Sequence, residues 1–168
     1  ALGIGAASMG YFATAPGTTA YSFGNNTIAA GSPSVAIGIN AKAQFDNSMS
    51  IGYFTEASGS NSIVMGFYND INTAGKLFEI GNGTADNARS NALTVLRNGN
   101  VGIGITAPNA VLQFANDISQ RKLVLYETAN NDHQCYGFGI NGGTLRYQTD
   151  ALGADHVFYA GADGTTSN

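Results

Sequence analysis

The sequence has little charge, one cysteine, three prolines and no tryptophan. Charged residues make up 11% of its 168 residues, against about 25% in an average soluble domain. A single cysteine, Cys135, excludes an intrachain disulfide framework. No apolar run reaches the roughly 18 residues of a membrane helix, and no basic-then-apolar signal peptide opens the chain. We therefore expect no membrane insertion within these residues, and any export signal is expected outside them.

The net charge is −4. This charge disfavours nucleic acid and anionic membranes as main partners, because both select basic surfaces. Only Lys42, Asp46 and Glu56 are charged in residues 1–68, so the scarcity of charge belongs to the first part of the chain. Glycine, in contrast, is abundant, with 23 residues. The positions of the glycines therefore carry the information.

Glycine marks a fourteen-residue repeat. Gly10, Gly24, Gly38, Gly52 and Gly66 follow one another at fourteen residues without a slip. Bulky apolar residues stand one and three positions before most of these glycines, and the residue between them is small or β-branched. The bulky positions include Met9, Phe23, Val35, Ile37, Met49, Ile51, Ile63 and Met65.

Each copy alternates with the period of two that is typical of a β-strand. In residues 34–38, Val35 and Ile37 face one way, and Ser34, Ala36 and Gly38 face the other. Fourteen residues accommodate two short strands and two tight turns, which make one coil of a parallel β-solenoid. Coils of this kind stack at about 4.8 Å.

The bulky apolar residues of the repeat need to be shielded from water. Small residues let the two walls of a coil approach closely, so the bulky residues find no room inside and form an exposed apolar stripe. Self-association around a symmetry axis would bury this stripe. The alternative is a thicker solenoid in which the bulky column faces its own core.

Residues 34–38, 47–52 and 61–66 resemble the head repeats of trimeric autotransporter adhesins, which also occur in trimeric phage tail fibres. The resemblance covers residues 1–72 and implies a homotrimer of left-handed parallel β-rolls. It also implies that the eight bulky residues named above form the trimer core. Departures from the repeat, such as Phe45 and Val64, predict that the roll ends near residue 70.

Residues 73–109 are predicted to form a β-hairpin linker. Asn98-Gly99 lies between two β-prone runs, 92–97 and 101–105, and is typical of a type I′ turn. Residues 91–104 are similar to a linking motif of phage and bacterial fibre proteins that often precedes a self-cleaving chaperone domain. We expect any such chaperone to have been cleaved off or to lie beyond residue 168.

Residues 110–168 are predicted to form a small antiparallel β domain. Its candidate strands are 111–114, 122–126, 136–140, 144–148 and 156–159, with a turn at 141–143. Tyrosine and arginine favour recognition surfaces, so Tyr136, Arg146 and Tyr147 are candidate receptor-binding residues. Alternatively, the tyrosines pack in a β core, which is the interpretation we favour for Tyr159.

No motif predicts catalysis, a cofactor or a metal site. Gly102-Ile103-Gly104 lacks the remainder of a dinucleotide fingerprint. His133 and His156 lack the further ligands of a zinc site. Carboxylates for sugar cleavage could come from four residues whose spacing does not place two across a cleft. These residues are Glu127, Asp132, Asp150 and Asp155.

The sequence thus predicts an all-β, non-enzymatic fibre segment that presents a trimeric receptor-binding surface outside the cell. We expect the partners to be further copies of the chain and a glycan or protein receptor on a host cell. A phage tail fibre is favoured over the head of a bacterial trimeric autotransporter adhesin because of the linking motif. A polysaccharide-degrading fibre enzyme is the alternative from another class.

Overall fold

The computed structural model describes residues 2–119 and 121–158, which are all-β and contain no helix. The chain divides into two compact units, Ala1–Asn116 and Asp117–Asn168. The three segments expected from the sequence, with boundaries after residues 72 and 109, stay a prediction.

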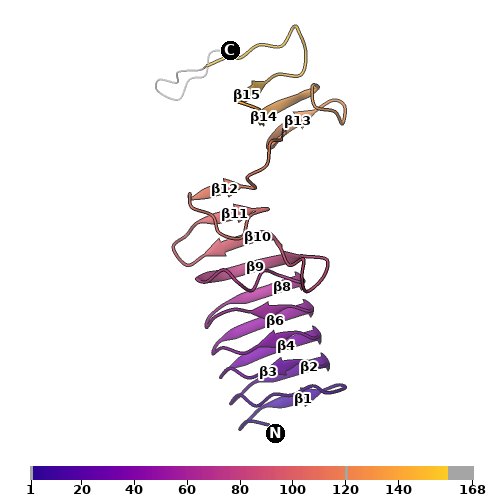
Figure 1. The fold of residues 1–168 in the computed structure, drawn as a ribbon, viewed down its shortest axis with the longest axis vertical. Helices are drawn as coiled ribbons and strands as arrows, with labels where there is room; N and C mark the ends of the chain where they lie inside the picture. Colours follow the sequence, from indigo (N-terminus) through magenta and orange to yellow (C-terminus); the bar gives the residue numbers. More distant parts are fainter. Residues whose placement is uncertain (1, 120, 159–168) are drawn as a thin grey trace, which may run out of the picture. The chain divides into compact units, whose positions relative to one another are not determined.

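The first unit is a β-solenoid whose strands stack in chain order (Figure 1). Its nine-stranded sheet consists of β1 (Ala7–Met9), β2 (Tyr21–Asn25), β4 (Ser34–Ile39), β6 (Ser48–Tyr53), β8 (Ile63–Phe67), β9 (Lys76–Asn82), β10 (Asn91–Leu96), β11 (Val101–Ile103) and β12 (Leu112–Phe114). A second sheet consists of β3 (Ile28–Ala29), β5 (Lys42–Ala43) and β7 (Glu56–Ala57). Each coil from β2 to β7 thus contributes two strands, as the sequence predicts, one of five or six residues and one of two.

From β1 to β8, the hydrogen-bond register of the parallel strands equals the sequence period. Gly24, Gly38, Gly52 and Gly66 pair in succession across β2, β4, β6 and β8. Because each strand pairs with the residue fourteen positions later, equivalent side chains form straight columns along the solenoid. The prediction of fourteen-residue coils is confirmed.

Small residues fill the interior of the coils. Ala29, Ala36 and Ala43 are completely buried. The hydroxyls of Ser22 and Thr27, at equivalent depth in a neighbouring coil, lie 2.8 Å apart and form a buried hydrogen bond. The bulky columns lie outside this narrow interior, which rejects the alternative of a thicker solenoid with the bulky residues in its own core.

The glycine column is required by close approach of the coils. Gly52 has a φ of +138°, which L side chains rarely adopt. A Cβ atom on Gly52 would lie 2.0 Å from the carbonyl oxygen of Gly66. The neighbouring coil therefore occupies the space that any side chain would need.

The parallel ladder continues beyond residue 70, where the sequence predicts the end of the roll. Strand β9 pairs in parallel with β8 and places Gly81 beside Gly66. The spacing between these glycines is fifteen residues instead of fourteen. This one-residue insertion hides the sixth copy from a search at a fixed period, although Phe78, Ile80 and Gly81 occupy the repeat positions.

A buried ionic cluster replaces the small residues at this sixth strand. Glu79 occupies the small column and is completely buried. Its Oε2 lies 2.8 Å from Lys76 Nζ and accepts hydrogen bonds from Asn69 and Asn91. Lys76 Nζ also lies 3.2 Å from Asp70 Oδ2. Each buried charge therefore has an opposite partner, as burial requires.

After the cluster the next two strand pairs of the sheet are antiparallel, and the last strand, β12, pairs in parallel with β11. Strands β9, β10 and β11 pair in antiparallel order, which confirms the hairpin at Asn98-Gly99. The predicted type I′ turn is wrong, because Gly99 (φ +89°) has a positive φ and Asn98 does not. The Leu96 amide bonds to the Asn100 carbonyl, which leaves a three-residue loop with glycine in the left-handed position, a common hairpin alternative.

The second unit contains one antiparallel sheet in the order β13 (Leu123–Glu127), β14 (Cys135–Asn141) and β15 (Thr144–Gln148). Its β14–β15 turn is the one predicted at residues 141–143. Residues 156–158 form no strand, in contrast to the prediction for 156–159. Tyr159, expected in the core, lies outside the described residues.

The glycine column yields a matched pair of substitutions. Gly52→Ala should lower the free energy of unfolding by about 3 kcal/mol or more, because it combines an unfavourable φ with a backbone clash. Gly59→Ala should change it by less than about 1 kcal/mol, because the nearest atom to its Cβ would be Arg97 Nη2 at 3.8 Å. Denaturant unfolding of both variants checks the difference, and equal losses would contradict it.

The ionic cluster predicts a dependence of stability on pH. Burial raises the pKa of Asp70, but hydrogen bonds from Thr73 and the charge of Lys76 outweigh burial and hold the pKa below its ordinary 3.8. A depressed folded-state pKa stabilises the fold above about pH 4, and this stabilisation disappears as the pH falls through the lower value. The free energy of unfolding should therefore fall more steeply below about pH 4 in the wild type than in Asp70→Asn. Parallel acid titrations of the two proteins, followed by urea unfolding, measure this.

Candidate functional site

Two rows of apolar side chains cross one face of the nine-stranded sheet. Residues paired across neighbouring strands point to the same side of a sheet, so the register defines each row. The first row is Met9, Phe23, Ile37, Ile51, Met65, Ile80, Leu93, Ile103 and Phe114, and the second is Ala7, Tyr21, Val35, Met49, Ile63, Phe78, Val95, Val101 and Leu112. We call the two rows together the apolar face.

The apolar face is open to solvent in the single chain. Met9 is 69% exposed, Ile63 39% and Ile37 37%. All eight residues predicted for the trimer core lie in the two rows, and those not exposed are half-buried. The structure brings these residues together on one surface, and their burial between chains stays a prediction.

The apolar face extends further than the sequence predicts. The repeat accounts for it as far as β8, whereas the register carries both rows through β9, β10, β11 and β12. Each added strand contributes two apolar residues separated by one residue, as in Phe78-Glu79-Ile80 and Leu112-Gln113-Phe114. This local spacing is the signal that could have revealed the extension.

The apolar face contains a hollow of about 310 Å³. Tyr21, Val35, Met49 and Ile63, all from the second row, line it together with Pro33. An apolar depression of this kind can receive a bulky side chain from another molecule.

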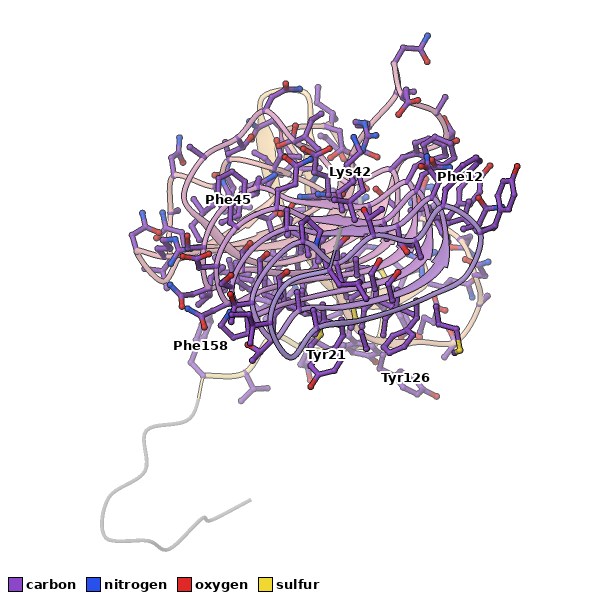
Figure 2. The ribbon with its side chains drawn as sticks, turned by 90° about the horizontal axis from the view of Figure 1, so that it is seen from below. Phe12, Tyr21, Lys42, Phe45, Tyr126 and Phe158 are labelled. Carbon is purple, nitrogen blue, oxygen red and sulfur yellow. The ribbon has the colours of Figure 1, made fainter. Side chains whose placement is uncertain are left out.

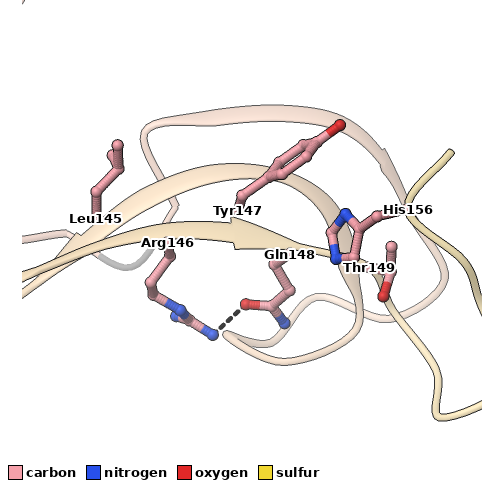
Figure 3. Close-up of a pocket in the computed structure, with 6 residues that line it drawn as sticks. All are labelled: Leu145, Arg146, Tyr147, Gln148, Thr149 and His156. Carbon is pink, nitrogen blue, oxygen red and sulfur yellow. Dashed lines mark hydrogen bonds between the residues drawn. The ribbon is translucent and has the colours of Figure 1, made fainter. Parts of the chain in front are cut away.

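The second unit has a hollow of about 420 Å³ along β15, lined by residues 145–149 and His156 (Figure 3). The rings of Tyr147 and His156 lie 4.5 Å apart between centroids. Tyr147 also stacks on Phe138 at 4.8 Å. Tyr147 is therefore held between two rings while 52% exposed, which fits the surface role predicted for it.

The three candidate receptor-binding residues lie on two faces of the sheet, and their role in binding stays a prediction. Tyr147 pairs with Phe138, which is two residues from Tyr136, so Tyr136 and Tyr147 lie on the same face of the sheet. Arg146 points to the opposite side, where it bonds to Gln148 (Figure 3) and to the carbonyl of Asp132 at 3.1 Å. Strand alternation therefore separates the Arg146 side chain from the two tyrosines, although Arg146 and Tyr147 both line the hollow along β15.

The candidate carboxylates form separate contacts. Glu127 pairs with Arg121, and Asp150 accepts a hydrogen bond from Thr128 at 2.9 Å. Asp132 and Asp155 are exposed. Within residues 2–119 and 121–158, no three His, Cys, Asp or Glu side chains gather where they could hold a metal ion. The same residues contain no helix long and apolar enough to cross a membrane.

Tyr136 has a raised pKa, chiefly because it is hydrogen-bonded to the Asp150 carboxylate. Asp150→Asn should move the pKa of Tyr136 down towards its ordinary 10.0, since the negative charge that opposes the phenolate disappears. NMR titration of labelled tyrosine rings measures this change. Tyr126→Phe is the control, because Tyr126 is the weakest of the causes. A larger decrease in Tyr126→Phe than in Asp150→Asn would contradict the assignment.

Comparison with known protein families identifies the repeat. Two copies of the YadA head domain repeat match residues 29–55 and 46–69, which span the coils of β4 and β6 and the start of the next. Comparisons with curated proteins and with solved structures find no significant match. Residues 29–69 are therefore adhesin-type head repeats of the kind found in trimeric autotransporter adhesins.

Proposed function

We propose that the chain is a non-enzymatic segment of a homotrimeric fibre, in which three apolar faces pack around a common axis. The observation that carries the proposal is the continuity of the apolar face over all nine strands. An apolar surface of this length is unfavourable in water and is normally covered by a partner. The YadA-type repeats support three as the number of chains.

The geometry of the columns favours self-association over a different partner. Equivalent residues recur along the stack, so copies of the chain placed around an axis parallel to the stack meet like residues at every level. A closed cyclic arrangement buries every copy of the face at once. The hollow beside Met49 and Ile63 offers a place for a bulky side chain of a neighbouring copy.

The fibre presents three copies of a receptor-binding surface outside the cell. Tyr136 and Tyr147 share a face of the second unit, and Tyr147 lines its hollow. The receptor is a glycan or a protein of a host cell. Three weak, identical sites on one assembly gain affinity through avidity, without a better single contact.

We place the segment in a phage-type tail fibre, and the head of a bacterial surface adhesin is the second assignment. The hairpin that follows the roll corresponds to residues 91–104, whose sequence is similar to the linking motif of fibre proteins. Because the apolar rows continue into this hairpin, the linker belongs to the same assembling surface.

The trimer is tested by mass and by charge substitution. Light scattering should give about 52 kDa, three times the 17.3 kDa of the chain. Ile37→Asp and Ile51→Asp should each reduce the mass towards that of one chain, because three like charges would be buried around one axis.

Phe45→Asp is the matched control for these substitutions. Phe45 is 42% exposed and lies at a corner of the roll, away from Tyr21 of the apolar face (Figure 2). Its substitution should leave the mass unchanged. A wild-type mass near 17 kDa, or a trimer that persists in both isoleucine variants, would refute the proposed packing.

A further inference from the structure

A second pocket lies in the solenoid unit, on the side away from the apolar face. It has a volume of about 210 Å³, and we call it the corner pocket. Its lining includes Asn26, Asn40, Lys42, Phe54, Glu56 and Arg89. Lys42 and Glu56 belong to the short sheet of β5 and β7, and Figure 2 shows Lys42 and Tyr21 on opposite sides of the roll. Packing of the apolar face therefore leaves this side accessible.

The polar part of the pocket is a short ladder of amides. Asn26 and Asn40 stand at equivalent corners of successive coils, with φ values of +52° and +53°. Asparagine tolerates this left-handed conformation better than most residues, and Asn26 Nδ2 donates to Asn40 Oδ1. Among the described residues, no partner is seen for Asn40 Nδ2, so a donor remains for a ligand.

The apolar part of the pocket is a fixed aromatic ring. Phe54 occupies the next corner of the same column, with a φ of +54°. Its ring stacks on Tyr68 with centroids 4.9 Å apart, and the Arg89 guanidinium lies 5.7 Å from the Tyr68 ring centre. Phe54 therefore lines the pocket with a ring whose position is stabilised by stacking on Tyr68.

The charges around the pocket are balanced. Lys42 Nζ lies 3.3 Å from Glu56 Oε2, and Arg89 Nη2 lies 2.6 Å from Asp86 Oδ1. Arg89 Nη1 also donates to the carbonyl oxygens of Phe54 and Asn69, and the two ion pairs leave no excess of either sign. Such a lining favours a neutral ligand that has many hydroxyl groups over an anion or a cation.

We propose that the corner pocket binds a neutral hexose unit of a glycan. The C–H face of a sugar ring would pack on Phe54, and its hydroxyls would bond to the Asn40 amide and to the ion pairs. The volume is below the roughly 300–1,000 Å³ of clefts for larger organic ligands, so it fits one sugar ring. The site lies in the repeat unit and is distinct from the tyrosine face of the second unit.

Saturation-transfer NMR on the full chain tests the proposal. The probes are methyl glycosides of glucose, galactose, mannose and N-acetylglucosamine, with the methyl glycoside of sialic acid as an anionic comparison. At least one neutral glycoside should receive saturation at its ring C–H protons, and the anionic one should receive less.

The test variants are chosen from residues at equivalent corners of successive coils, Phe12, Asn26, Asn40 and Phe54. Phe54→Asn introduces the residue found at the two preceding corners, and Asn40→Gly removes the amide while keeping the left-handed backbone accessible. Each should weaken binding about tenfold. Phe12→Asn, with a φ of +54° at the same column but outside the pocket, is the matched control and should bind as the wild type does.

The outcomes separate this site from the second unit and from the trimer. Absence of transfer to every neutral glycoside, transfer that persists in both pocket variants, or preference for the anionic probe would overturn the proposal. Transfer lost in Tyr147→Ala but kept in Asn40→Gly would also overturn it, and would place sugar binding on the tyrosine face. None of these results depends on the mass of the assembly, which light scattering measures separately.

Discussion

The close approach of the two walls of each coil is the constraint on which the rest of the structure depends. Where alanine, serine and threonine are the only residues inside, the walls lie too near for a branched aliphatic or aromatic side chain. Bulky residues then have one place left, the outer surface of the long strands. The apolar face is therefore a direct consequence of a narrow interior, and its exposure in the single chain is the reason for proposing self-association.

At the end of the fourteen-residue coils, large charged side chains take the place of the small interior residues. Glu79 and Lys76 cannot occupy a space made for Ala36 or Ser50, so the coil around them must open and supply partners. Asn69, Asp70 and Asn91 provide these partners from segments before and after β9. The interior is ionic at this level, and the fourteen-residue parallel pairing does not continue beyond it. The chain continues instead as an antiparallel hairpin, which needs no second wall.

Much of the solenoid could be predicted because sequence period and hydrogen-bond register are the same quantity in a stack of equal coils. The prediction failed where the period and the register differ, since the one-residue insertion before Gly81 hides that β9 is a sixth copy of the repeat. The ionic cluster was not predicted, because its members come from residues 69–91 and their contacts follow only from the strand register.

The faces on which Arg146 and Tyr147 lie are a different case. Neighbours in a strand point to opposite sides, so the sequence already placed these two side chains on opposite faces of their strand.

The corners are where a fibre of this design can acquire specificity. In the regular coils most interior positions hold small residues, the glycine column has no room for a side chain, and the apolar face is the proposed packing surface. Corner positions at φ near +54° hold Phe12, Asn26, Asn40 and Phe54 in successive coils, which shows that this column tolerates different chemistry on one backbone. Since the register repeats, a change at one corner leaves its neighbours in place. A recognition surface can therefore vary coil by coil along the stem while the packing that holds the stem together stays the same.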